Sequence, residues 1–119
     1  MSAFFYSRTG KAIVFQKGIH LFTFDGTPVA FFHNNALYGL NARFLGYFVD
    51  GWIRDKSGNA VLYTDNHSKA GPITPVPENP PIPPIPPIPP IPPIPPIPPV
   101  SPIPSHNWSS IDADDFFKS

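Results

Sequence analysis

Histidines are the side chains in this sequence best suited to metal binding or acid–base chemistry, and there are four: His20, His33, His67 and His106. Their separations of 13, 34 and 39 residues match no local pattern of metal ligands. Serine and aspartate are present, but without the strand–turn–helix context of a nucleophile motif. We therefore expect no enzymatic activity, no catalytic residue, no metal and no cofactor.

Aromatic side chains are a second source of chemistry, because their flat faces can stack on sugar rings. Aromatic side chains exposed on hairpins would make the protein a glycan- or cell-surface-binding module. The candidates for stacking on sugar rings are Tyr6, Phe22, Tyr38 and Trp52. The opposing interpretation is that aromatics recurring at a fixed spacing on both strands of hairpins form a core. Core packing is the prediction that we favour, and glycan binding is the alternative function.

The elements that must position these residues are limited by composition. The chain has 119 residues, no cysteine and 20 prolines, of which only Pro28 precedes residue 71. A segment more than half proline forms neither a helix nor a central strand. The part that can fold has roughly 65 to 70 residues, near the lower limit for an independent core, which excludes most large enzyme folds.

Charge and targeting signals are equally sparse. The formal net charge is zero, and neither half is basic enough to predict nucleic-acid binding. The sequence lacks a signal segment and a run of about 20 apolar residues, so we expect no membrane span and place the protein in the cytoplasm by default. Export by a dedicated system stays open.

A 16-residue repeat organises the first half of the chain. Four units carry a small residue at the same place, and three further columns at fixed distances from it repeat in type. The columns are the small residue (Gly10, Gly26, Ala42, Gly58), an aliphatic three later (Ile13, Val29, Leu45, Val61), an aromatic five later (Phe15, Phe31, Tyr47, Tyr63) and an apolar residue five earlier (Phe5, Leu21, Leu37, Ile53).

Each unit has the signature of a β-hairpin, since a turn pair such as Asp25-Gly26 lies between β-branched and aromatic residues. A three-residue loop ending in the glycine would place each apolar residue of the fourth column opposite its aliphatic partner, as Phe5 opposite Ile13. Strand alternation then puts the Phe15 column on the inner face, and Tyr6, Phe22 and Tyr38 on the outer face.

Two stretches, residues 21–31 and 37–55, together with Trp108-Ser109-Ser110 and residues 115–117, resemble the bacterial 4-fold β-flower family. The resemblance implies four hairpins around a pseudo-fourfold axis and no established activity. We therefore predict an all-β fold: a four-hairpin domain (1–66), a linker (67–79), a polyproline II rod (80–104) and an aromatic, acidic tail (105–119). Ala42 departs from the family's usual glycine, and alanine in a left-handed conformation costs about 1 kcal/mol.

The proline segment carries an aliphatic residue at every third position from Ile73 to Ile103, interrupted by Asn79. Polyproline II has three residues per turn, so these side chains share one face, and a straight segment would span roughly 90 Å. One interpretation is a stiff spacer whose apolar stripe binds a partner; the other is a passive tether. An exposed stripe of that length is unusual for a monomer.

The tail has large apolar side chains in a polar context, which disordered tails rarely keep. Ser110, followed by acidic residues, is the expected N-cap of a short helix. A straight rod would prevent the tail from reaching its own hairpins, so it would bind another molecule. We predict a structural or protein-interaction module that binds a protein partner or assembles with itself into an oligomer or filament. The residues predicted to make these contacts are Ile82, Ile85, Ile88, Ile91, Ile94, Ile97, Trp108, Phe116 and Phe117.

Overall fold

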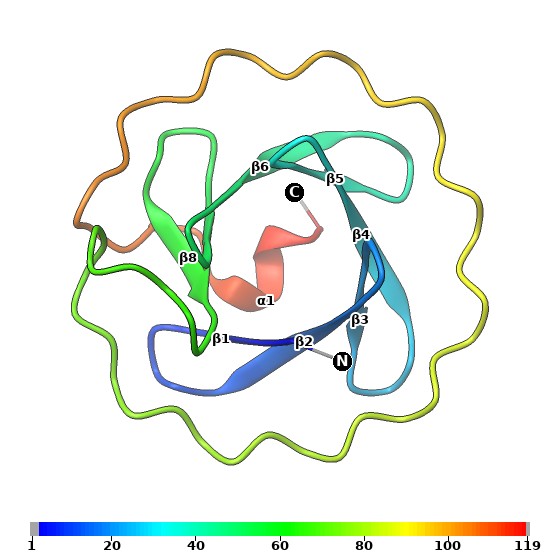
Figure 1. The fold of residues 1–119 in the computed structure, drawn as a ribbon, viewed down its shortest axis with the longest axis horizontal. Helices are drawn as coiled ribbons and strands as arrows, with labels where there is room; N and C mark the ends of the chain where they lie inside the picture. Colours follow the sequence, from blue (N-terminus) through cyan, green and yellow to red (C-terminus); the bar gives the residue numbers. More distant parts are fainter. Residues whose placement is uncertain (1–2, 119) are drawn as a thin grey trace.

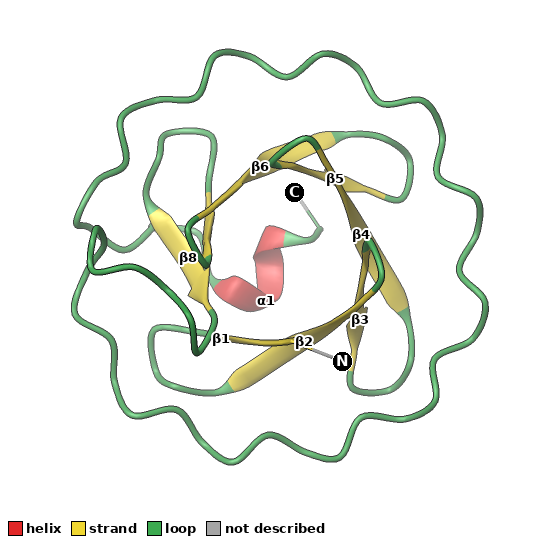
Figure 2. Ribbon diagram, in the orientation of Figure 1, coloured by secondary structure: helices red, strands yellow, loops and turns green. Residues whose placement is uncertain are grey.

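Eight short antiparallel strands close into a barrel in the computed structural model, which describes residues 3–118 (Figures 1 and 2). Residues 1, 2 and 119, the outermost positions of the predicted hairpin domain and tail, lie outside the described residues. The strands are β1 (Ala3–Tyr6), β2 (Ala12–Lys17), β3 (His20–Thr23), β4 (Pro28–His33), β5 (Ala36–Gly39), β6 (Phe44–Val49), β7 (Trp52–Arg54) and β8 (Ala60–Tyr63). One helical turn follows, α1 (Ala113–Phe116). The all-β fold of hairpin repeats is confirmed.

The long loop of each hairpin has three residues and ends in the repeat's small residue. In the first hairpin, the amide of Gly10 donates to the carbonyl of Ser7, and the amide of Ser7 donates to the carbonyl of Lys11. Gly10, Gly26 and Gly58 have φ near 87°, and Ala42 has φ 66°. This left-handed backbone explains why three of the four units place glycine here, and it leaves Ala42 strained.

The predicted cross-strand pairs are wrong by one residue. Every hairpin has a β-bulge just after its loop, so Phe5 faces Val14 instead of Ile13, and Leu21 faces Ala30 instead of Val29. The third and fourth hairpins repeat the shift, with Leu37 opposite Gly46 and Ile53 opposite Leu62. The aliphatic column is the extra, unpaired residue of the bulge, which strand alternation alone does not reveal.

Tight turns join one hairpin to the next and make the sheet continuous. Asn34 and Asn35, like Asp50 and Gly51, all have positive φ, the conformation that favours two-residue turns between antiparallel strands. Neighbouring hairpins therefore pair along the strands that these turns connect, and a single pair, Tyr6 with Tyr63, closes the barrel.

The barrel interior holds one apolar cluster, and the tail completes it. The apolar column of the repeat lines it with side chains that are fully buried: Phe5, Leu21, Leu37 and Ile53. Ala113 and Phe116 of α1 belong to the same cluster, and Phe32 and Phe48 pack against it. Figure 1 shows α1 at the centre of the circle of strands.

The aromatic column faces outward, so the prediction that it lies on the inner face was wrong, whereas Phe5, Leu21, Leu37 and Ile53 are inside as predicted. Because each bulge adds a residue, the Phe15 column lies with Tyr6, Phe22 and Tyr38 on the outside of the barrel. There the two columns meet as four directly opposed cross-strand pairs, one at each junction between hairpins: Phe15 with Phe22, Phe31 with Tyr38, Tyr47 with Arg54, and Tyr63 with Tyr6. We call these eight residues the outer flank.

The proline-rich segment does not project as a straight rod. Residues 72–104 run around the barrel as a ring, which we call the proline ring (Figure 1). At about 3.1 Å per residue these roughly 33 residues extend about 100 Å, and a circle 35 Å across, the widest extent of the molecule, has a circumference of about 110 Å. The radius of gyration is 13.3 Å, close to the roughly 13.5 Å of a globular chain of this length.

The tail binds its own barrel, because the curved ring returns the chain to where it left. Trp108 forms a parallel bridge with Ala60, and the amide of Ser109 donates to the Ala60 carbonyl. The predicted helix cap was wrong by two residues. Asp112, and not Ser110, caps α1 by accepting from the amide of Asp114.

Candidate interaction surface

The proline ring is fastened to the outer flank by tyrosine hydroxyls. Tyr38 donates to the carbonyl of Pro96 at 2.7 Å, Tyr47 to that of Pro99 at 2.9 Å, and Tyr63 to that of Pro75 at 3.1 Å. Burial raises the pKa of all three phenols, so the hydroxyls keep their protons and remain donors. The flank residues beneath are buried, with at most 6% of any side chain exposed.

The carbonyls that the flank binds follow the period of the ring sequence. Residues 75, 96 and 99, and residue 105 beyond them, differ by multiples of three, and each of the first three immediately precedes an outward aliphatic residue. The exception is a longer second contact of the Tyr47 hydroxyl, with the Val100 carbonyl at 3.3 Å. A chain with three residues per turn presents one carbonyl per turn to the same side. The flank thus contacts one edge of the segment, and the aliphatic side chains point the opposite way.

The hairpin tips also contact the ring. A β-carbon at Gly10 would lie 2.8 Å from the Val76 carbonyl oxygen, and one at Gly58 would lie 2.9 Å from that of Ile103. Glycine at these tips therefore serves the close approach of the ring as well as the left-handed turn. Beside Gly10, the carboxylate of Glu78 accepts from the amide of Ala12 at 2.8 Å, and the amide of Glu78 donates to the Gly10 carbonyl.

His20 lies under the ring between two aromatic rings of the flank. Its ring centroid is 6.3 Å from that of Phe22 and 6.4 Å from that of Phe31. Only 7% of His20 is exposed, and its Nε2 has no hydrogen-bond partner among residues 3–118. Burial lowers the pKa of His20, partly opposed by the backbone of Pro90. Next to it, Lys17–His20, Phe22 and Pro86–Pro89 line an open cavity of about 460 Å³.

Arg54 joins the two ends of the ring. Its Nη1 donates to the carbonyl of Ser105 at 2.8 Å and to that of Gly58 at 2.8 Å, and its Nη2 donates to the carbonyl of Ala70 at 2.7 Å. Ala70 precedes the ring and Ser105 follows it, so a single guanidinium holds both ends. Only 3% of Arg54 is exposed. Burial lowers its pKa, opposed by the charges of Asp50 and Asp55, and a guanidinium stays charged regardless.

The residues around Arg54 complete the closure of the ring. Trp52 lies 5.6 Å from the guanidinium and donates from its indole nitrogen to the Ser68 carbonyl at 3.0 Å. Gly71 packs directly on the indole, where a β-carbon would approach to 2.5 Å. On the other side, the hydroxyl of Ser109 donates to the Asp55 carboxylate at 2.6 Å. We call Trp52, Arg54 and Asp55 with these partners the closure site.

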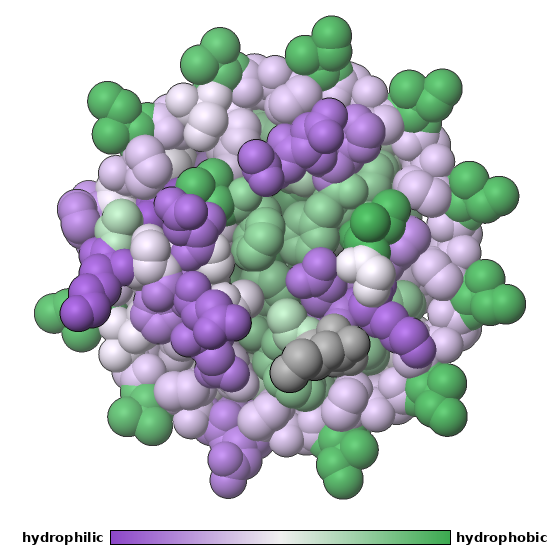
Figure 3. Space-filling view, viewed as in Figure 1, coloured by the Kyte–Doolittle hydropathy of each residue, from purple (hydrophilic) through white to green (hydrophobic). Residues whose placement is uncertain are grey.

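The aliphatic residues of the ring stand outward and are almost fully exposed. Ten side chains are 90–96% exposed, namely Ile73, Val76, Ile82, Ile85, Ile88, Ile91, Ile94, Ile97, Val100 and Ile103. Figure 3 shows them as separate apolar knobs around the rim of the molecule. The six isoleucines predicted as interaction residues, Ile82 to Ile97, all belong to this set, which we call the outward stripe.

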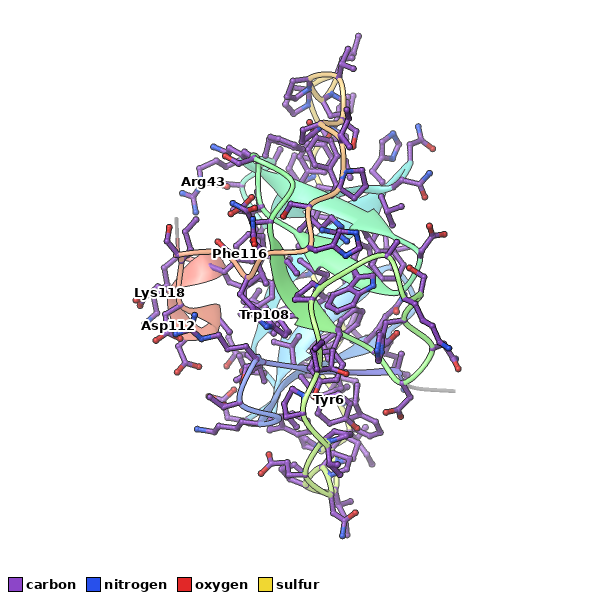
Figure 4. The ribbon with its side chains drawn as sticks, turned by 90° about the vertical axis from the view of Figure 1, so that its left-hand side faces the viewer. Tyr6, Arg43, Trp108, Asp112, Phe116 and Lys118 are labelled. Atoms are coloured by element: carbon purple, nitrogen blue, oxygen red, sulfur yellow. The ribbon has the colours of Figure 1, made fainter. Side chains whose placement is uncertain are left out.

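The predicted tail residues have different surroundings from those isoleucines. Phe116 is buried in the barrel, Phe117 packs half-buried against the same cluster, and Trp108 packs on Trp52 and Tyr63 at 5.9 and 6.1 Å. Seen from the side, the tail covers one face of the molecule, with Asp112 and Lys118 at its outer edge (Figure 4). A cavity of about 350 Å³ separates Trp108–Asp114 from the first hairpin.

The aromatic residues proposed for glycan stacking are not exposed. Tyr6, Phe22, Tyr38 and Trp52 are each at most 2% exposed, because the ring and the closure site cover them. This corrects the alternative function at its named residues. Within the described chain, no group of three metal-ligating side chains comes together.

Arg54 is a functional residue that was not predicted from the sequence. In the column four residues before the small one, Tyr6, Phe22 and Tyr38 are aromatic, and Arg54 alone is charged. That break in the repeat was the available signal. The one position of this column without an aromatic side chain is the one whose side chain joins the two ends of the proline ring.

Comparison with known proteins gives one match. A family model described as "4-fold beta flower protein" matches residues 3–117, which includes the proline segment and most of the tail. No curated protein and no solved structure matches the chain. In the part of the chain that the structure describes, no helix is long and apolar enough to cross a membrane.

Proposed function

We propose that the chain, which belongs to the 4-fold beta flower protein family, is a non-enzymatic protein-interaction module. It self-assembles through the outward stripe. The family has no established activity. The barrel acts as a scaffold, and the proline ring on its rim provides the binding surface. The observation that supports this proposal is the exposure of ten aliphatic side chains, each at least 90%, at regular three-residue steps around the rim.

Such a stripe is unfavourable in water unless something covers it. Burying one isoleucine contributes about 1.5–3 kcal/mol, so ten exposed side chains leave a large apolar contribution unused. The ring itself carries no charge between Glu78 and Asp112 that would oppose contact with an apolar surface.

A second copy of the chain is the occupant that fits best. In an extended chain of three residues per turn, neighbouring aliphatic side chains are about 9 Å apart, and every copy has the same spacing. The side chains of one rim can therefore enter the gaps of another. The formal net charge of zero means that copies do not repel each other at long range.

The convex shape of the rim limits each contact. Two rims that touch edge to edge share only about three side chains each, or roughly 10 kcal/mol of gross apolar burial, which is comparable with the cost of association. A single contact is thus weak, whereas a rim that contacts several neighbours at once gains from multivalency. The expected product is a concentration-dependent assembly of many copies rather than a tight dimer.

Sedimentation velocity over a wide concentration range tests the proposal. The wild-type chain is expected to form larger species as concentration rises, and a variant with Ile85, Ile91 and Ile97 changed to Asn is expected to remain monomeric. Ile111→Asn is the matched control, because Ile111 is a partly exposed aliphatic residue outside the stripe. A wild-type chain that stays monomeric throughout would refute self-assembly.

The tail contributes less than the sequence predicted. Phe116 and Trp108 already pack on the chain's own barrel, so they are not free to anchor another molecule. The proposal therefore assigns self-assembly to the isoleucines of the outward stripe and assigns the tail to the stability of the barrel.

A further inference from the structure

We propose that the outer flank of the barrel is a binding site for polypeptides built of Pro-Pro-x triplets, and that residues 80–104 are its built-in ligand. This concerns the inner edge of the ring and is independent of the outward stripe. The ligand is a proline-rich strand of a partner protein, in which x stands for any residue.

The chemistry of the flank suits such a strand. A polyproline segment makes no internal hydrogen bonds, so its carbonyls are free acceptors, and it has hardly any amide donors of its own. A surface that recognises it must offer donors next to flat apolar faces, as aromatic-lined grooves for proline-rich ligands do. The flank offers hydroxyls at Tyr38, Tyr47 and Tyr63 on a belt of stacked aromatic side chains, such as Phe31 and Tyr38 with centroids 5.6 Å apart.

The register of the contacts defines the ligand. Tyr38 and Tyr47 bind Pro96 and Pro99, which occupy the same place in consecutive triplets. A third contact of the same register, Tyr63 with Pro75, lies at the far end of the ring. The site therefore binds the proline that precedes x, once per turn, and a few triplets across Tyr38 and Tyr47 are enough to use two donors.

The third residue of the triplet is free to vary. Isoleucines 82 to 97 are 93–96% exposed, so their side chains do not contact the flank. Replacing x by a polar residue removes no contact with the barrel. This separates the inner site from the outward stripe, where the identity of x is the essential feature.

In the intact chain the built-in ligand blocks the site. A segment tethered at both ends competes at an effective concentration in the millimolar range, so a free peptide cannot displace it. The sequence provides a way to open the ring, because Glu78 is its single glutamate and lies exposed near the start of the ring. A glutamate-specific protease cuts there and releases one end.

Fluorescence anisotropy of a labelled peptide with eight Pro-Pro-Asn triplets tests the site. The peptide is titrated with the intact chain, with the chain cut after Glu78, and with a full-length variant whose residues 80–103 are replaced by glycine and serine. We expect saturable binding to the replaced variant and none to the intact chain. The cut chain is expected to bind more weakly than the replaced variant, because Pro96 and Pro99 remain tethered close to Ser105 and still compete. A peptide of eight Pro-Pro-Ile triplets is expected to bind within about threefold of the first.

Two controls address specificity. A glycine–serine peptide of equal length should not bind, and the double substitution Tyr38→Phe with Tyr47→Phe in the replaced variant should weaken Pro-Pro-Asn binding about tenfold. Near-UV circular dichroism verifies that each sample keeps its packed aromatic residues. If the replaced variant is unfolded, a full-length variant in which only residues 92–100 are replaced by glycine and serine is used instead, because it also frees Tyr38 and Tyr47.

The proposal is overturned if the folded replaced variant fails to bind at millimolar peptide, or if the tyrosine substitutions leave binding unchanged. A preference for Pro-Pro-Ile over Pro-Pro-Asn by tenfold or more would likewise overturn it, because binding would then depend on x. The Pro-Pro-Asn outcomes do not bear on self-assembly, since that peptide lacks the aliphatic stripe. The Pro-Pro-Ile comparison is made on the replaced variant, which lacks the isoleucines of the outward stripe.

Discussion

Replacing Arg54 by lysine should open the proline ring at its closure site. The guanidinium makes three hydrogen bonds, to the carbonyls of Ala70, Ser105 and Gly58. A lysine ammonium is a point charge without the planar fork, so it can keep about one of them. Each hydrogen bond to a charged donor contributes about 1.5–3 kcal/mol to the free energy of unfolding. We use the lower value because burying the charge has a cost that opposes these bonds. The loss of two bonds then lowers the free energy of unfolding by about 3 kcal/mol.

Two assays measure this loss. With a denaturant slope of about 1.5 kcal/mol per molar, the midpoint of urea unfolding should fall by about 2 M. Cleavage after Glu78 by a glutamate-specific protease should accelerate about a hundredfold, because cleavage follows the open population and each 1.4 kcal/mol changes it tenfold. Arg43→Lys is the matched control, since the side chain of Arg43 is exposed.

The reasoning would be refuted by a specific result. If Arg54→Lys shifts the midpoint by less than about 0.3 M and changes the cleavage rate less than threefold, Arg54 does not hold the ring closed. A lower midpoint without faster cleavage would mean that Arg54 stabilises the barrel alone.

Three further predictions concern the tail, a hairpin tip and the flank. Phe116→Ala should destabilise the protein by about 3–5 kcal/mol because Phe116 fills the barrel, and half-buried Phe117→Ala should cost clearly less; urea denaturation of both variants checks the difference. Ala42→Gly should stabilise by about 1 kcal/mol by relieving the left-handed alanine, measured as a higher thermal midpoint. Burial lowers the pKa of His20, so below pH about 6.5 the unfolded chain takes up a proton that the folded chain does not, and stability should fall with pH there. A His20→Gln variant, compared at pH 7.5 and 5.5, should lose less stability, and an equal loss would exclude His20 as the cause.

The sequence predicted the hairpins well because their signals are local. A glycine suited to positive φ at each tip and a fixed 16-residue step can be recognised in the sequence of a single chain. The three-residue loops that end at Gly10 and Gly26 follow from them. The bulges are different, because a bulge depends on which residue the partner strand leaves unpaired. One unseen bulge in each unit moved the Phe15 column from the inside of the barrel to the outer flank.

The course of the proline segment could not be read from its own residues. Each triplet favours an extended chain, but whether such a chain is straight or curved depends on contacts along one edge. The hydroxyls of Tyr38, Tyr47 and Tyr63 supply those contacts from distant hairpins. The same curvature explains why the tail was wrongly predicted to bind another molecule. The curved segment brings Phe116 back to the barrel of its own chain.

Small-angle scattering of the monomer, collected on a dilute sample directly after size-exclusion chromatography, tests most directly whether the ring encircles the barrel. The encircling ring predicts a radius of gyration within a few ångströms of the 13.3 Å of the structure. It also predicts a scattering profile of a single disc about 35 Å across between its backbone edges. A straight proline rod of roughly 90 Å would instead give a maximum dimension above about 100 Å, and that result would contradict the account.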